Sequence, residues 1–218
     1  MKYQNIIFDF DGTLADSKNC SVVATRKAFE DLKLNIPSVE MIEHYMGIPI
    51  EISFKEMAER ELDEDEFELL LQTFRKHYKE SENTLLEVFP NIPKMLKELV
   101  EDKRLLFVVS SKKTDVLQRN LESLEILKFF RDVIGSDKVL HYKPHPDGLL
   151  KIIDLYQLKK SDTVMIGDAI FDLQMAKAAG IDSCGVTWGS HKRDKLSEES
   201  PTHLIDNVEQ LILSKTVL

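Results

Sequence analysis

Four short apolar runs constrain the fold of this chain more than any other feature of its sequence. They are Ile6–Phe8, Leu105–Val109, Val164–Ile166 and Cys184–Thr187. Each run is continuous rather than alternating, which is typical of a strand buried on both faces of a parallel sheet. The first three runs lead directly into polar or glycine-bearing turns. We also predict a short fifth strand at Val133–Ile134.

Segments with helical spacing of apolar residues lie between these runs. The spacing predicts helices over Asn91–Asp102, Pro146–Leu158 and Phe171–Ala179. Gly180 stands where the last of them needs a C-cap. Strands that alternate with helices indicate βαβ units. We therefore expect an α/β fold whose core is a Rossmann-like, doubly wound parallel sheet.

The stretch from Ser17 to Leu86 breaks this alternation, because its pattern predicts helices and no strand. Its clearest helix runs from Phe67 to Tyr78, with apolar residues at helical spacing, and the acidic run Asp63–Glu66 stands at its start. We therefore predict an all-helical cap domain inserted at residues 17–86. The core domain would consist of residues 1–16 and 87–218, with 87–93 as the return linker.

Charge and cysteine content narrow the range of partners. The net charge of −9 repels nucleic acid and anionic membranes, so neither is an expected partner. Cys20 and Cys184 have no metal-ligand or redox spacing, which indicates free thiols in a reducing compartment. No apolar stretch approaches the roughly 20 residues of a membrane helix. We expect a cytoplasmic protein, and a small anionic substrate stays open if local positive groups or a metal offset the negative charge.

Polar side chains that could carry chemistry follow the predicted strands. In an open parallel sheet the ligand lies at the carboxyl ends of the strands. The residues that would meet there are Asp9, Asp11, Ser110, Ser111, Lys143, Asp168 and Asp172. Carboxylates crowded at one edge raise each other's pKa unless a positive charge holds them. A hard divalent cation with oxygen ligands, Mg²⁺, would resolve this repulsion.

Two histidines flank the lysine of this set. His141 and His145 have the i, i+4 spacing of a zinc pair on a helix. Pro144 and Pro146 do not permit a helix there. We therefore do not expect a helical zinc site around Lys143.

Four strings resemble the motifs of the haloacid dehalogenase-like hydrolase superfamily. "DFDGTLAD", "VVSSK", "KPHPD" and "IGDAIFDLQMAKAAG" occur here in the order seen in that superfamily. With its helical insertion after the first strand, the chain resembles the phosphoglycolate phosphatase-like branch. The resemblance implies Mg²⁺-dependent hydrolysis of a small phosphorylated metabolite, a phosphomonoester, through an aspartyl-phosphate.

The resemblance also implies a role for each motif residue. Asp9 would be the nucleophile and Asp11 the general acid and base. Lys143 would neutralise phosphate charge and keep Asp9 ionised. The remaining phosphate-binding positions would be Gly12, Ser110 and Ser111. The implied metal-binding residues are Asp9, Asp11 (through its backbone carbonyl), Asp168 and Asp172.

The apolar loop at Gly47, Ile48 and Pro49 is our candidate for substrate contact. Alternatives stay open both for the role of this loop and for the function of the whole chain. The loop would otherwise be a plain helix–helix turn. An inorganic pyrophosphatase and a sugar-phosphate mutase share the core motifs, although mutases carry an arginine shortly after the cap glycine and here none occurs before Arg60. Asp11 argues against a halide-cleaving enzyme. An inactive phosphate-binding homologue and a phospho-signalling receiver domain are the non-enzyme alternatives.

Overall fold

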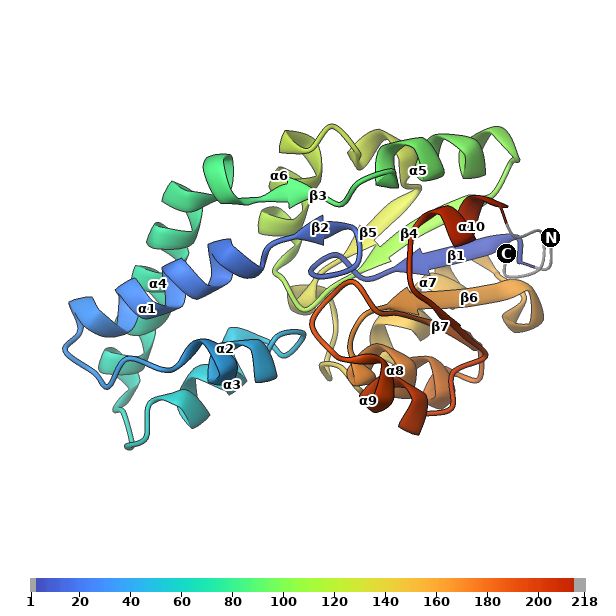
Figure 1. The fold of residues 1–218 in the computed structure, drawn as a ribbon. Helices are drawn as coiled ribbons and strands as arrows, with labels where there is room; N and C mark the ends of the chain where they lie inside the picture. The colour runs from blue at the N-terminus through green and yellow to red at the C-terminus, as the bar shows by residue number, and fades with distance from the viewer. Residues whose placement is uncertain (1–2, 214–218) are drawn as a thin grey trace.

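A six-stranded parallel sheet forms the core of the computed structural model, which describes residues 3–213 (Figure 1). The strand order is β5-β4-β1-β6-β7-β8. The strands are β1 (Asn5–Phe8), β4 (Leu105–Val109), β5 (Asp132–Ile134), β6 (Thr163–Gly167), β7 (Asp182–Val186) and β8 (His203–Ile205). The predicted α/β fold with a doubly wound parallel sheet is confirmed.

Strand β1 occupies the middle of this sheet although it comes first in the chain. Asn5 pairs with Leu105 of β4 on one side and with Thr163 of β6 on the other. The chain therefore extends the sheet in one direction through β4 and β5, then in the opposite direction through β6, β7 and β8. The carboxyl end of β1 lies at this change of direction, where open α/β sheets form their ligand-binding crevice.

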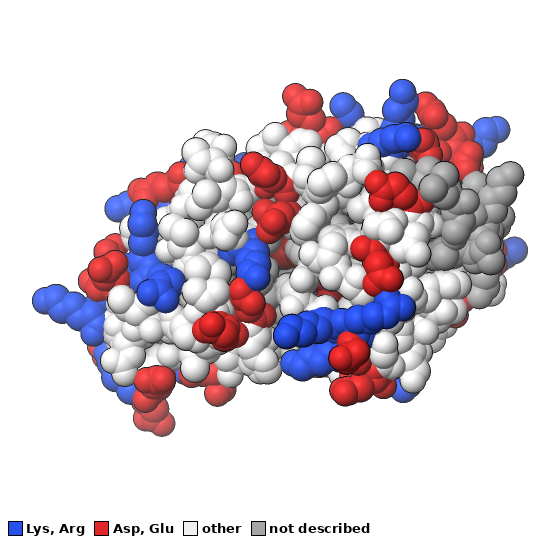
Figure 2. Space-filling model, viewed as in Figure 1, with Lys and Arg blue, Asp and Glu red and all other residues white. Residues whose placement is uncertain are grey.

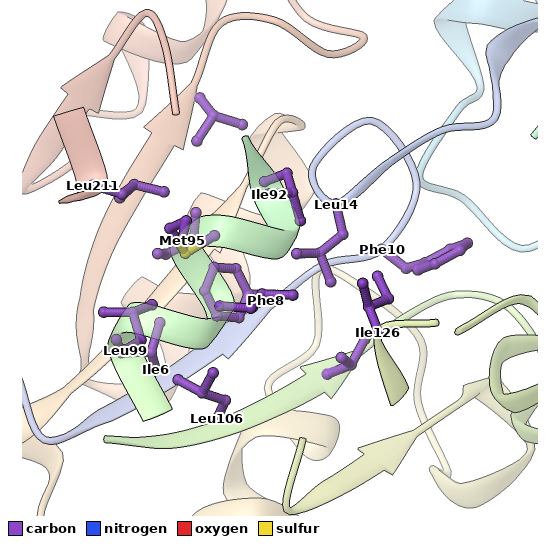
Figure 3. Close-up of a cluster of buried hydrophobic side chains, with 14 of the residues drawn as sticks. Ile6, Phe8, Phe10, Leu14, Ile92, Met95, Leu99, Leu106, Ile126 and Leu211 are labelled. Atoms are coloured by element: carbon purple, nitrogen blue, oxygen red, sulfur yellow. The ribbon is translucent and has the colours of Figure 1, made fainter. Parts of the chain in front are cut away.

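Helices cover both faces of the sheet (Figure 1). One face packs against α5, α6 and α10, and the other against α7 and α8. On the first face, Ile92, Met95 and Leu99 of α5 point toward Ile6 and Phe8 of β1 (Figure 3). The helices of the core are α5 (Ile92–Glu101), α6 (Thr114–Ser123), α7 (Asp147–Tyr156), α8 (Ile170–Ala179), α9 (Arg193–Glu198) and α10 (Glu209–Leu213). Short 3-10 turns occur at Leu127–Phe129, Ser136–Lys138 and Lys160–Asp162.

Four helices between β1 and β4 form a helical unit, by which we mean α1 to α4. They are α1 (Lys18–Asp31), α2 (Val39–His44), α3 (Ile50–Met57) and α4 (Glu64–Leu85). The unit has its own apolar cluster, in which the ring of Phe54 lies edge-on to the rings of Phe29 and Phe74. Asp63 and Glu66 form a capping box at the start of α4, so the acidic run begins that helix as predicted.

A two-stranded ribbon connects the helical unit to the core. Its strands β2 (Ala15–Asp16) and β3 (Glu87–Val88) are antiparallel, with Ala15 opposite Val88. Both chain crossings between the two parts therefore lie side by side (Figure 1). The segment that we expected to be only a return linker thus contains a strand.

Several elements were not predicted or were misplaced. The sequence pattern did not indicate β8, α6, α9 or α10. The spacing of apolar residues predicts a helix over 52–62, but α3 spans Ile50–Met57. Within residues 3–213, no helix is both long and apolar enough to cross a membrane. On the face shown in Figure 2, basic and acidic side chains are interspersed.

Candidate active site

The predicted site residues converge at the carboxyl edge of the sheet. Asp9 directly follows β1, Ser110 follows β4, and Asp168 follows β6. Lys143 lies in the loop that precedes α7, and Asp172 lies in the first turn of α8. All five residues are buried. The strand order therefore brings together side chains that are far apart in the sequence.

A buried lysine connects two of the carboxylates. The Nζ atom of Lys143 lies 2.7 Å from Oδ1 of Asp9 and 2.7 Å from Oδ1 of Asp172. Burial alone would lower the pKa of Lys143, but the attraction of Asp172 and Asp9 outweighs this effect and raises it. The lysine therefore stays charged and holds the Asp9 carboxylate in a fixed position.

Three buried carboxylates lie close enough together to share one cation. Ligand oxygens of Asp9, Asp168 and Asp172 all lie within 4.8 Å of one another. Burial, together with repulsion between these groups, raises the pKa of Asp9 to about 7 and that of Asp168 to about 6. Burial also raises the pKa of Asp172. Carboxylate oxygens at this density fit a hard divalent cation such as Mg²⁺.

Hydrogen bonds from neighbouring residues hold two of these carboxylates in position. Asp168 accepts from the Thr13 hydroxyl at 3.0 Å and from the Ser190 backbone N–H at 2.6 Å. The second oxygen of Asp172 accepts from the Ala169 backbone N–H at 3.1 Å, at the start of α8. Both oxygens of Asp172 therefore already accept hydrogen bonds, one from this N–H and one from the lysine.

Two glycines let loops close against Asp168. Gly12 has a φ of +74°, and a Cβ atom there would lie 2.1 Å from Asp168 Oδ2. A Cβ atom at Gly189 would lie 2.3 Å from the same oxygen and 2.4 Å from the Gly12 carbonyl oxygen. The neighbouring Trp188 donates from Nε1 to the Thr13 carbonyl at 3.1 Å. Gly12 and Gly189 therefore enclose Asp168 from two sides.

Asp11 belongs to a different set of contacts from Asp9. Its carboxylate accepts a hydrogen bond from the Ser17 hydroxyl and lies 2.9 Å from Nζ of Lys112. Lys112 also donates to the Tyr78 hydroxyl at 2.9 Å and lies over the Tyr78 ring. Tyr78 belongs to α4, so this lysine connects Asp11 of the core to the helical unit.

Sequence reasoning missed Lys112 as a site residue. It stands in the turn after β4, directly behind two serines that we did select, but a single lysine in a turn normally points into solvent. Burial alone would lower the pKa of Lys112, but Asp11 and Tyr78 outweigh this effect and raise it. The partner Tyr78, 34 residues upstream, was not visible from the local pattern.

The two serines after β4 differ in their contacts. Ser110 is buried, and its hydroxyl accepts from the Lys112 backbone N–H at 3.2 Å. The hydroxyl of Ser111 donates instead to the carbonyl oxygen of Gly47 at 2.7 Å. Ser111, predicted as a phosphate-binding residue, thus contacts the loop between α2 and α3.

The loop between α2 and α3 shares a cavity with the carboxylates of Asp9 and Asp11. Gly47, Ile48 and Pro49 line the cavity together with Asp9 and Asp11, and its volume is about 300 Å³. The predicted substrate-contact loop therefore lies in reach of a molecule bound at the site.

The two histidines around Lys143 come together without a helix. Their ring centroids are 4.4 Å apart, and each Nδ1 faces the carboxylate of Asp147, at 3.0 Å from His141 and 2.8 Å from His145. The prolines exclude a helix there, as predicted, since α7 begins only at Asp147. The histidines come together without a helix because the loop that carries them brings both rings to Asp147.

Comparisons with known proteins agree on one family. The sequence model of the family described as haloacid dehalogenase-like hydrolase matches residues 6–186. The chain is 30% identical over 213 residues to phosphoglycolate phosphatase of Vibrio parahaemolyticus, with 95% of this chain and 93% of that protein covered. It is 27% identical over 212 residues to pyrophosphatase PpaX of Oceanobacillus iheyensis, with 97% and 96% covered.

The fold is also similar to solved structures. A haloacid dehalogenase-like family hydrolase from Streptococcus pneumoniae superposes with a TM-score of 0.84 at 28% identity, over 96% of this chain and 97% of that one. The likeness spans both the sheet and the helical unit.

Proposed function

Because this chain belongs to the haloacid dehalogenase-like hydrolase family, we propose that it is a Mg²⁺-dependent phosphatase of small phosphomonoesters. The observation that carries the proposal is the buried set of Asp9, Lys143, Asp168 and Asp172 at the end of the central strand. The nearby Asp11 completes the pair of acids that such a reaction needs. The reaction would run through an aspartyl-phosphate on Asp9.

The two aspartates divide the chemistry between them. The Asp9 carboxylate attacks phosphorus, the bond to the ester oxygen breaks, and Asp11 gives a proton to the leaving oxygen. In the second half, Asp11 takes a proton from a water molecule that attacks the same phosphorus. This step releases inorganic phosphate and restores the Asp9 carboxylate. Lys143 neutralises negative charge on the transferring group, since its ammonium lies beside Asp9.

The acidic set is suited to a divalent cation. Asp9 and Asp168 would bind Mg²⁺ with the Asp11 carbonyl, and Asp172 would orient Lys143 or bind directly. The cation supplies positive charge that offsets the carboxylates and the phosphoryl oxygens. The raised pKa values of Asp9 and Asp168 support this assignment, because burial and the repulsion between the carboxylates disfavour their charged forms, and a bound cation would offset both effects.

Hydrolysis of inorganic pyrophosphate is the second candidate function, and the relative named pyrophosphatase supports it. Phosphoglycolate is a first ester to test, because another relative carries the name phosphoglycolate phosphatase. A sugar-phosphate mutase function has less support, because mutases carry an arginine shortly after the cap glycine, and here no arginine follows Gly47 before Arg60. We place the reaction in the cytoplasm, supported by two buried, unpaired cysteines.

Release of inorganic phosphate from a panel of esters and pyrophosphate tests this proposal. Asp9→Asn should abolish turnover, and excess EDTA should do the same to the unmodified protein. Asp194→Asn is the matched control, because Asp194 is an exposed carboxylate in α9. Full activity of Asp9→Asn, or full activity in EDTA, would contradict the mechanism. Phosphate bound without turnover by an intact protein would favour the non-catalytic binder.

A further inference from the structure

The cavity beside Asp9 extends well beyond the space that a phosphoryl group needs. It begins at Asp9 and Asp11 and continues between the helices of the helical unit to Phe54, Met57 and Phe74. These three side chains belong to the buried apolar cluster of that unit. The carboxylates at one end of the cavity therefore face an apolar interior at the other.

Carboxylates already neutralise most of the cations that line this cavity. Lys112 pairs with Asp11 at 2.9 Å, and Arg75 pairs with Glu51 at 3.0 Å. A substrate with a second anionic group would have to compete with these carboxylates for each cation.

Three further cations line this cavity. Arg119 pairs with Glu82 at 2.8 Å. Lys113 is exposed and lies 3.9 Å from Glu51, the partner of Arg75. Lys79 forms no ion pair among the described residues, but it is exposed, so water screens its charge. The interior of the cavity thus offers apolar surface rather than an unpaired positive charge.

We propose, on the premise of the phosphatase function above, that the substrate is a monophosphate ester with an apolar leaving group. A cavity of about 300 Å³ has room for about ten groups of the size of a water molecule. The phosphoryl end takes part of this volume, which leaves space for a chain of about six carbons. The leaving group enters between the loop at Ile48 and helix α6 and lies against the aromatic side chains of the helical unit.

A series of alkyl phosphates tests the inference directly. Ethyl, butyl and hexyl phosphate have leaving groups of nearly equal intrinsic reactivity, so chain length reports burial alone. Each buried methylene is expected to raise kcat/KM about fourfold. Hexyl phosphate should therefore exceed ethyl phosphate about 200-fold, and should exceed phosphoglycolate and pyrophosphate.

Variants in the cavity wall locate the effect. Ile48→Asn should lower the hexyl-to-ethyl ratio of kcat/KM at least tenfold, because Ile48 is half-buried in the wall. Ile52→Asn is the matched control, since Ile52 is exposed on α3 and should leave the ratio unchanged. Val116→Asn repeats the test from α6 on the opposite side, should Ile48→Asn fail to fold.

The outcomes separate this inference from the proposed function. Equal kcat/KM for ethyl and hexyl phosphate, with Asp9-dependent turnover, overturns the apolar leaving group and leaves the phosphatase intact. No phosphate release from any ester in Mg²⁺ overturns both. A preference for phosphoglycolate or pyrophosphate that Lys79→Met removes also overturns the inference, because it shows that a second anion is bound.

Discussion

Affinity for Mg²⁺ should depend strongly on pH, because the cation must displace protons from its ligands. In the metal-free site, burial raises the pKa of Asp9 to about 7 and that of Asp168 to about 6. Metal binding requires both groups to be deprotonated. Protonation of each group weakens Mg²⁺ binding by a factor of 1 + 10^(pKa − pH).

The size of this effect follows from the two pKa values. The product of the two factors is about 140 at pH 5.5 and about 1.4 at pH 7.5. Mg²⁺ should thus bind about 100-fold more weakly at pH 5.5, a loss of about 2.7 kcal/mol. At pH 6.5 about one proton should leave for each cation bound.

Isothermal titration calorimetry of EDTA-treated protein measures both quantities. Affinity is compared at pH 5.5 and 7.5, and two buffers with different ionisation enthalpies give the proton release at pH 6.5. Asp147→Asn is the control, because Asp147 belongs to the exposed histidine cluster, and its loss should not change the pH dependence. Equal affinity at the two pH values, with no proton released, would refute the reasoning.

The free energy of unfolding should also depend on pH, because the same two carboxylates bind protons more tightly in the folded state. The pKa values of Asp9 and Asp168 are raised from the model-peptide value of 3.8, so between about pH 4 and 7 the folded state holds more protons than the unfolded chain. Through these two groups, the free energy of unfolding of metal-free protein falls as the pH rises across that window. The increase in Tm on adding Mg²⁺ should accordingly be larger at pH 7.5 than at pH 5.5, which differential scanning fluorimetry can measure.

Three further predictions concern other parts of the structure. Gly189→Ala should weaken Mg²⁺ binding and lower kcat/KM at least tenfold, because its Cβ would displace Asp168; unchanged calorimetric affinity would contradict this. Glu82→Gln should lower the free energy of unfolding by about 2 kcal/mol in urea titrations. That difference should shrink as the pH falls below 4.5, because hydrogen bonds from Arg119 and Asn120 outweigh burial and hold the pKa of Glu82 below this value. Burial raises the pKa of Cys20 to about 11 and that of Cys184 to about 12, so thiol reagents should label neither at pH 8 until the protein unfolds.

The strands of the core were predictable because burial on both faces leaves a local signal. The runs around β1, β4 and β6 are continuous and apolar, and the polar residues after them meet at one edge for topological reasons alone. Strand β8 gives no such signal, since His203–Ile205 is short and only half-buried over two of its residues. Helix α6 was missed because few apolar residues mark its buried face.

The part of the site that connects the core to the helical unit was not predictable from local patterns. Lys112 contacts both Asp11 and Tyr78, and these contacts span 101 and 34 residues of the chain. Ser111 likewise contacts Gly47, 64 residues away, rather than a position defined by its own strand. Such pairs depend on how α4 and the α2–α3 loop lie over the sheet, which periodicity does not determine.

The central position of β1 has a consequence for how the protein is made. Its residues leave the ribosome before those of its partners on the two sides, since Leu105 and Thr163 follow Asn5 by 100 and 158 residues. At 5–20 residues per second, the apolar run of β1 remains without its second neighbour for about 8 to 30 seconds. During synthesis this run is thus a segment for chaperones to shield. Chains that end before Thr163 leave one edge of β1 unpaired, so premature termination yields aggregation-prone fragments rather than a smaller enzyme.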